Sequence, residues 1–298
     1  MKSFSDFCEE ILKQVKETLP PPYGEGECLL REIQKINETY TGLIIRKKDQ
    51  PITIAVKLEQ YYQDYRNGTA METILDSILK QTENDCLNPL SFIPNAMKSY
   101  ESVRPRLFLR VSNKAMNQEL LNKTPHKTVM DLALTYHISL KELKGQNASI
   151  MVNGELLESW KITKNKLHLD CLNNSPRIMP CEVLPIQKVL KDSDGPKDLI
   201  QSQRMPLYVV RSKGWGSAAA LFYPGTMQKL SEIAKGNYYI LPSSIHEVLM
   251  LPAGELADLT SLKTMVREIN KTIVEENSRL SDNVYLYDRQ KDALRIAE

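Results

Sequence analysis

Apolar side chains recur with changing period along the first ninety residues. From residue 4 to residue 15 they stand three and four positions apart, which predicts an amphipathic helix that the prolines at 20–22 would end. Two β-branched runs then flank the polar residues 46–50, which predicts a hairpin. Helical spacing returns over residues 58–65 and 70–80. We therefore expect residues 1–90 to form an N-terminal helix–hairpin–helix region.

Residues 91–298 carry the pattern of one larger domain. Extended segments are predicted at residues 105–111, 128–139, 148–153, 207–212, 237–241, 245–251 and 284–288. Helices are predicted near residues 117–122, 226–236 and 256–274, and residues 155–173 fit a helix, although residues 166–172 also alternate as a strand would. This mixture predicts an α+β fold, with a mixed or largely antiparallel sheet and packed helices. Prolines at 176, 180, 185, 196 and 206 predict a Pro-rich loop near residues 174–206.

Composition narrows the class of protein. The chain has 39 Lys and Arg against 37 Asp and Glu, so its formal charge of +2 gives no overall attraction to DNA or to an acidic membrane. No apolar run approaches the roughly 18–20 residues that span a bilayer. The five cysteines are scattered without a CxxC pair, and the four histidines share no metal-ligand spacing with them. We expect a cytoplasmic protein with no metal, no cofactor and no membrane partner.

A polar stretch at residues 243–247 interrupts an apolar run and is the first candidate for chemistry. In a regular strand Ser244 and His246 would share a face, roughly 7 Å apart along the backbone, and Glu247 would point the other way. That spacing is long for a nucleophile–base hydrogen bond, but His246 could act as an acid/base group, which makes Ser244 and His246 the candidate catalytic residues of a hydrolase. The alternative is a serine-capped turn with a structural histidine, which the absence of a nucleophile-elbow motif favours.

A second candidate is the basic segment that precedes residue 111. As a strand it would place Arg104, Arg106, Phe108 and Arg110 on one exposed face. Three guanidinium groups beside an aromatic ring could bind phosphates or an acidic partner surface. The alternative is a solvated edge strand, whose charges discourage aggregation.

Three C-terminal blocks resemble an uncharacterised bacterial family of gut anaerobes. They are residues 242–247, which spell Pro-Ser-Ser-Ile-His-Glu, residues 265–270 and residues 280–285. The likeness extends over most of the chain, although the hairpin block departs from the family pattern at residues 35–43 and 52–62. The family has no assigned activity, so the resemblance implies one folded unit and a set of signature residues. These are Pro242, Ser243, Ser244, His246, Glu247, Arg267 and Asn270.

The function that the sequence favours is that of a cytoplasmic, non-catalytic binding or interaction protein with a protein partner. From the family's bacterial setting we further expect carriage on a mobile element and inhibition of a host system. One alternative is a hydrolase-type enzyme that uses His246 with Ser244 or with a carboxylate from elsewhere in the fold. A second alternative is a nucleic-acid-binding regulator, which needs a continuous basic surface joining residues 104–110 to residues 46–48 or 161–166.

Overall fold

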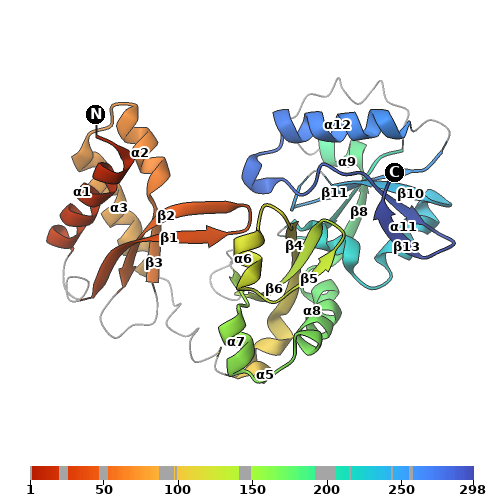
Figure 1. Cartoon of the computed structure of the whole chain (residues 1–298), viewed down its shortest axis with the longest axis horizontal. Coiled ribbons are helices and arrows are strands. Elements are labelled where there is room, and N and C mark those ends of the chain that lie inside the picture. The colour runs from red at the N-terminus through yellow and green to blue at the C-terminus, as the bar shows by residue number, and fades with distance from the viewer. Residues whose placement is uncertain are drawn as a thin grey trace. The chain divides into compact units, whose positions relative to one another are not determined.

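The computed structural model describes residues 2–19, 26–46, 53–86, 97, 99–140, 149–191, 206–214, 216–242, 244–254 and 258–298. The chain divides into two compact units, one formed by residues up to Lys98 and the other by residues from Ser99 onward (Figure 1). The boundary that we predicted between residues 90 and 91 lies outside the described residues. Helices accompany three sheets in which all described strand pairs are antiparallel, so the predicted α+β fold is confirmed.

The first unit places three helices on a three-stranded sheet. Its elements are α1 (Phe4–Thr18), β1 (Glu27–Lys35), β2 (Glu38–Arg46), β3 (Thr53–Lys57), α2 (Leu58–Arg66) and α3 (Met71–Cys86). The strand order is β1-β2-β3. Apolar faces of all three helices meet one face of the sheet, with Phe7, Leu43 and Ile78 fully buried. The predicted helix, hairpin and helices are therefore present, and β1 adds a third strand beside the hairpin.

The second unit begins with a small sheet built around one central strand. Its elements are α5 (Tyr100–Val103), η2 (Arg104–Arg106), β4 (Leu107–Asn113), α6 (Gln118–Asn122), β5 (His126–Val129), β6 (Leu132–Ser139), β7 (Ser149–Met151), α7 (Gly154–Ser159) and α8 (Lys164–Ile178). Strand β6 pairs with β4, β5 and β7. Helix α8 packs on this sheet, where the Ser175 hydroxyl accepts the backbone N–H of Leu109 at 2.9 Å.

The segment 128–139, predicted as one strand, is a hairpin. Met130 has a φ of 55°, in the left-handed region that strands do not use, and the chain reverses there. Val129 consequently pairs with Leu132, and β5 returns along β6. The turn places Met130 and Asp131 at the end of the β5–β6 ladder.

A six-stranded sheet completes the second unit. Its elements are β8 (Cys181–Pro185), α9 (Ile186–Lys191), β9 (Tyr208–Ser212), η3 (Ala218–Phe222), α11 (Thr226–Ala234), β10 (Tyr238–Leu241), β11 (Val248–Pro252), α12 (Leu259–Thr272), η4 (Glu276–Ser278), β12 (Tyr285–Asp288) and β13 (Ala293–Ile296). The strand order is β13-β12-β10-β11-β9-β8. Helix α12 buries Leu262 and Val266 against Leu241, Leu251 and Val284.

The predicted Pro-rich loop is wrong for the described part of its range. Residues 174–191 lie in the end of α8, in β8 and in α9. Pro176 stands in the last turn of α8, and Pro185 ends β8 at the edge of the sheet, where a missing ladder N–H is tolerated. Residues 192–205 lie outside the described residues.

Candidate functional site

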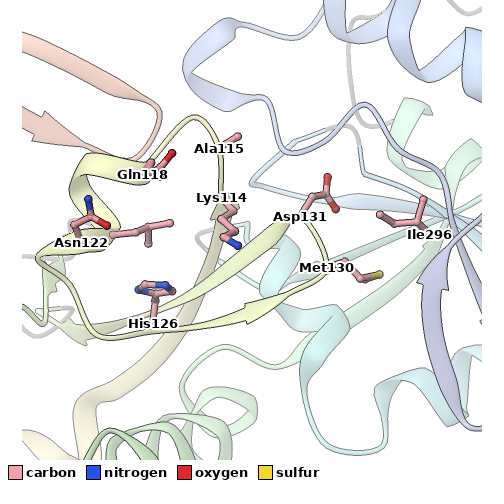
Figure 2. A pocket seen from close by; sticks show the side chains of 9 residues that line it. Lys114, Ala115, Gln118, Asn122, His126, Met130, Asp131 and Ile296 are labelled. Carbon is pink, nitrogen blue, oxygen red and sulfur yellow. The ribbon is translucent and has the colours of Figure 1, made fainter.

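A pocket of about 590 Å³ lies in the second unit, next to the hairpin of β5 and β6 (Figure 2). Its walls come from the segment after β4, from α6, from β5, from the β5–β6 turn and from β13. The nine residues that line it are Lys114, Ala115, Gln118, Leu121, Asn122, His126, Met130, Asp131 and Ile296. Apolar and polar groups therefore share one hollow, which is the usual composition of a small-ligand site.

Local hydrogen bonds fix the turn that carries Lys114. The Lys114 N–H donates to the Asp131 carbonyl at 2.9 Å, so the segment stays anchored to the hairpin beyond the end of β4. The Asn113 side chain accepts the Met116 N–H at 2.9 Å, and Asn117 donates its amide back to the Asn113 carbonyl at 2.7 Å. These short-range bonds fix the backbone that leads into α6, and Lys114 and side chains of α6 line the same pocket.

Only Nδ1 of His126 has a hydrogen-bond partner among the residues that the structure describes. Its Nδ1 lies 2.9 Å from the Thr124 carbonyl oxygen, which can only accept a hydrogen bond. Nδ1 therefore carries the proton, and in the neutral ring Nε2 keeps its lone pair. The ring is half-buried, and it points with the Lys114 side chain toward the space between them (Figure 2). Nε2 of His126 can therefore accept a hydrogen bond from a ligand.

The Asp131 carboxylate is saturated by three donors from the C-terminal region. Oδ2 accepts from Ser281 Oγ at 2.5 Å and from Asn283 Nδ2 at 3.0 Å, and Oδ1 accepts from the Tyr285 hydroxyl at 2.7 Å. Burial raises the pKa of Tyr285, so this phenol remains a neutral donor. Asp131 thus fastens the hairpin turn to the segment before β12.

Lys114 contributes an ammonium group to the lining of the pocket. No carboxylate of the described residues lies within ion-pair distance of it. Gln118 and Asn122 on α6 add amide donors and acceptors to the same lining, and both side chains are exposed. The polar part of the pocket is therefore suited to an anionic group.

The predicted geometry of Ser244 and His246 is wrong, because no strand passes through them. Strand β11 begins at Val248, and residues 244–247 form a turn. The Ser244 hydroxyl accepts the backbone N–H groups of His246 at 3.1 Å and of Glu247 at 3.3 Å. The His246 side chain is exposed, and no bond joins its ring to Ser244. The serine-capped turn is the alternative that the geometry matches.

The predicted basic face at residues 104–110 is also not formed. Residues 104–106 make a turn of 3₁₀ helix, because Pro105 has no N–H for a strand ladder. Phe108 is 1% exposed, so its ring is buried and does not face solvent. Arg104 lies 3.3 Å from Asp170 and 3.5 Å from Glu101. Arg110 is half-buried on β4. These four side chains therefore do not share an exposed surface.

The family-signature residues have mainly structural contacts. The buried Asn270 amide donates to the Ser281 carbonyl at 2.9 Å and to Asp282 Oδ1 at 2.8 Å, and Pro242 accepts the Ser281 N–H. Glu247 lies 3.4 Å from Arg211. Arg267 is exposed on α12, and Ser243 lies outside the described residues.

Sequence reasoning missed the pocket residues. Lys114, His126 and Ile296 stand in unrelated segments, and no spacing connects them. Asp131 gave the one local signal, because a carboxylate interrupts an otherwise apolar run from residue 129 to residue 134. That run was interpreted as part of a continuous strand.

The described residues were also compared with the requirements of a metal site and of a membrane-spanning helix. They contain no group of three or more His, Cys, Asp or Glu side chains arranged to hold a metal ion. None of the described helices has the length and apolar character needed to cross a membrane.

Comparison with known proteins assigns a family. Residues 4–289 match the model of a family described as Family of unknown function (DUF5688), and the chain belongs to this family. No curated protein and no solved structure matches the chain at a significant level.

Proposed function

We propose that the protein is a binding protein that holds a small organic anion in the pocket beside Lys114 and His126. The observation that carries the proposal is the charge distribution of the lining. Its one carboxylate, Asp131, accepts three hydrogen bonds, while Lys114 has no acidic partner among the described residues. An anion would supply the missing countercharge.

The apolar part of the lining supports a ligand with a hydrocarbon portion. Leu121, Met130 and Ile296 contribute side chains from three separate elements. A volume of about 590 Å³ is in the range of small-molecule sites rather than of ion sites. A phosphate or carboxylate attached to a ring or a short aliphatic chain matches both halves of the pocket.

We further propose that the protein is cytoplasmic and acts on a protein partner. Cys8, Cys28, Cys171 and Cys181 are free thiols, which supports a reducing, cytoplasmic setting. The resemblance to a family of gut anaerobes supports a bacterial source and carriage on a mobile element. A protein partner that responds to the bound ligand would join the pocket to the interaction role that we expected from the sequence.

Isothermal titration calorimetry with phenyl phosphate and benzoate tests the proposal, with phenol as the uncharged comparison. We expect saturable binding of at least one anion and none of phenol. Lys114→Met should weaken that binding by roughly 10- to 100-fold, because charge-assisted hydrogen bonds contribute about 1.5–3 kcal/mol.

Lys123→Met is the matched control, since Lys123 is exposed next to α6 and does not line the pocket. Its affinity should equal that of the wild type. Binding that Lys114→Met leaves unchanged, or an absence of binding by both anions, would overturn the proposal.

A further inference from the structure

The His126 ring is held in place by the short segment that joins α6 to β5. The Thr124 N–H donates to the Leu121 carbonyl at 3.2 Å, and the Thr124 hydroxyl donates to the Leu120 carbonyl at 2.7 Å. Pro125, whose φ is fixed by its ring, follows. Nδ1 of His126 then lies 2.9 Å from the Thr124 carbonyl oxygen. Bonds within the chain therefore set the orientation of the imidazole.

The hydrogen bond to Thr124 also decides which ring nitrogen carries the proton. A carbonyl oxygen only accepts hydrogen bonds, so the proton of the neutral ring is on Nδ1 and Nε2 is an acceptor. His126 lines the pocket with a half-buried ring. A ligand that pairs with Nε2 must therefore carry a hydrogen-bond donor.

The other polar side chains of the lining do not make the same requirement. The Lys114 ammonium only donates, which suits the anionic group of a ligand. Gln118 and Asn122 each carry donors and an acceptor, so they can pair with either kind of ligand atom. The Asp131 carboxylate already accepts three hydrogen bonds. Nε2 of His126 is thus the group that can distinguish one anion from another.

We propose that His126 selects a hydroxylated anion. The carboxylate or phosphate of this ligand binds Lys114, and its hydroxyl donates to Nε2 of His126. The inference rests on the proposed anion pocket and adds the group that accompanies the negative charge. A hydroxyl suits the pocket better than an ammonium, because a second positive charge would lie near that of Lys114. An anion without the donor leaves the acceptor unpaired, which lowers affinity roughly tenfold.

Isothermal titration calorimetry at about pH 8, at which an ordinary imidazole is neutral, tests this selection. The probes are benzoate and phenyl phosphate with a hydroxyl at the meta or para position, each compared with the compound that carries fluorine there. Fluorine is close to a hydroxyl in size and cannot donate a hydrogen bond. We expect at least one hydroxyl compound to bind roughly tenfold more tightly than its fluorine counterpart.

Two histidine variants assign the preference to a residue. His126→Phe removes the acceptor, so the hydroxyl compound and its fluorine counterpart should bind within about twofold of each other. Should that variant not fold, His126→Leu takes its place with the same expected result. His246→Phe is the matched control and should keep the wild-type preference, since His246 is exposed and does not line the pocket.

The outcomes separate this inference from the anion pocket itself. Benzoate or phenyl phosphate that binds while no hydroxyl compound exceeds its fluorine counterpart would overturn the hydroxyl requirement and leave the anion pocket in place. A preference that survives in His126→Phe or His126→Leu would overturn the role of His126. If neither the parent anions nor their derivatives bind, both proposals fail.

Discussion

Asp131 connects the β5–β6 turn to the segment that leads into β12. Its two oxygens accept three hydrogen bonds, from Ser281, Asn283 and Tyr285. Asp131→Asn replaces an acceptor with a donor and leaves at least one of these groups unpaired. We expect a loss of roughly 2–4 kcal/mol in the free energy of unfolding, measured in urea.

Glu158→Gln is the control for Asp131→Asn, since Glu158 is exposed on α7 and its side chain has no hydrogen bond or ion pair with the described part of the chain. Its unfolding free energy should change by less than about 0.5 kcal/mol. Equal small effects of the two variants would show that Asp131 does not hold the hairpin in place.

Two signature residues on α12 should differ sharply in their effect on stability. Asn270 is buried and donates two hydrogen bonds from one amide group, whereas Arg267 is exposed. Asn270→Asp removes the donors and places a second carboxylate beside Asp282, so it should cost about 2–4 kcal/mol in urea unfolding. Arg267→Ala should stay within about 0.5 kcal/mol. A large effect of Arg267→Ala would instead indicate a contact that the fold does not show.

At the scale of elements, Asp170 ties α5 to α8. It accepts from the Tyr100 hydroxyl at 2.6 Å and lies 3.3 Å from Arg104 and 3.5 Å from Lys166. Burial opposes its ionisation, but the Tyr100 hydrogen bond and the two cations prevail and hold the pKa of Asp170 below 3.8. Because the folded pKa lies below the unfolded one, the ionised carboxylate stabilises the fold at neutral pH. That contribution is lost as the pH falls through the folded pKa.

Asp170→Asn should therefore lower the free energy of unfolding by about 1–2 kcal/mol at pH 7, a figure that allows for the exposure of both cations. The difference from the wild type should shrink as the pH falls below 3.8. Tyr100→Phe should cost a similar amount, and the two changes together less than their sum. Urea unfolding between pH 7 and pH 3 measures this; a difference that grows on acidification would contradict it.

The sequence predicts a helix well where apolar residues recur with helical spacing along one face. It misplaces a strand where local side-chain hydrogen bonds determine at which residue the strand begins. The spacing of Phe4, Phe7 and Ile11 gave α1 correctly. The start of β11 was placed too early, because the Ser244 hydroxyl holds the following N–H groups in a turn. Strand β13 (Ala293–Ile296) was missed, since its exposed alternate positions carry no β-branched signal.

For the whole molecule, the two units have separate hydrophobic cores, and each is expected to unfold as its own cooperative unit. Ile74→Ala truncates a side chain that is buried in the first unit, and Leu109→Ala one in the second. Each should cost roughly 2–5 kcal/mol. Scanning calorimetry should show each variant lowering a different transition; a single transition that both variants shift would contradict this expectation.

The candidate pocket could not be predicted from the sequence, because it exists only after the chain has folded. Lys114 and His126 flank α6, but Ile296 comes from the far end of the chain. The turn that positions Asp131 depends on partners roughly 150 residues away, as the bonds to Ser281 and Tyr285 require. The family resemblance pointed instead to residues 242–247, whose described members form a turn.

The most direct test of the proposed pocket is a nitrogen-edited NMR spectrum of the histidine rings during titration with phenyl phosphate. Each imidazole has its own signals, and His126 lines the pocket with Nδ1 bonded to the Thr124 carbonyl, which leaves Nε2 as the acceptor. We predict that the His126 Nε2 signal shifts saturably, that the His246 signals stay in place, and that Lys114→Met requires at least about tenfold more phenyl phosphate for the same shift. A His126 signal that does not move, or that moves equally well in Lys114→Met, would contradict the assignment of this pocket as the binding site.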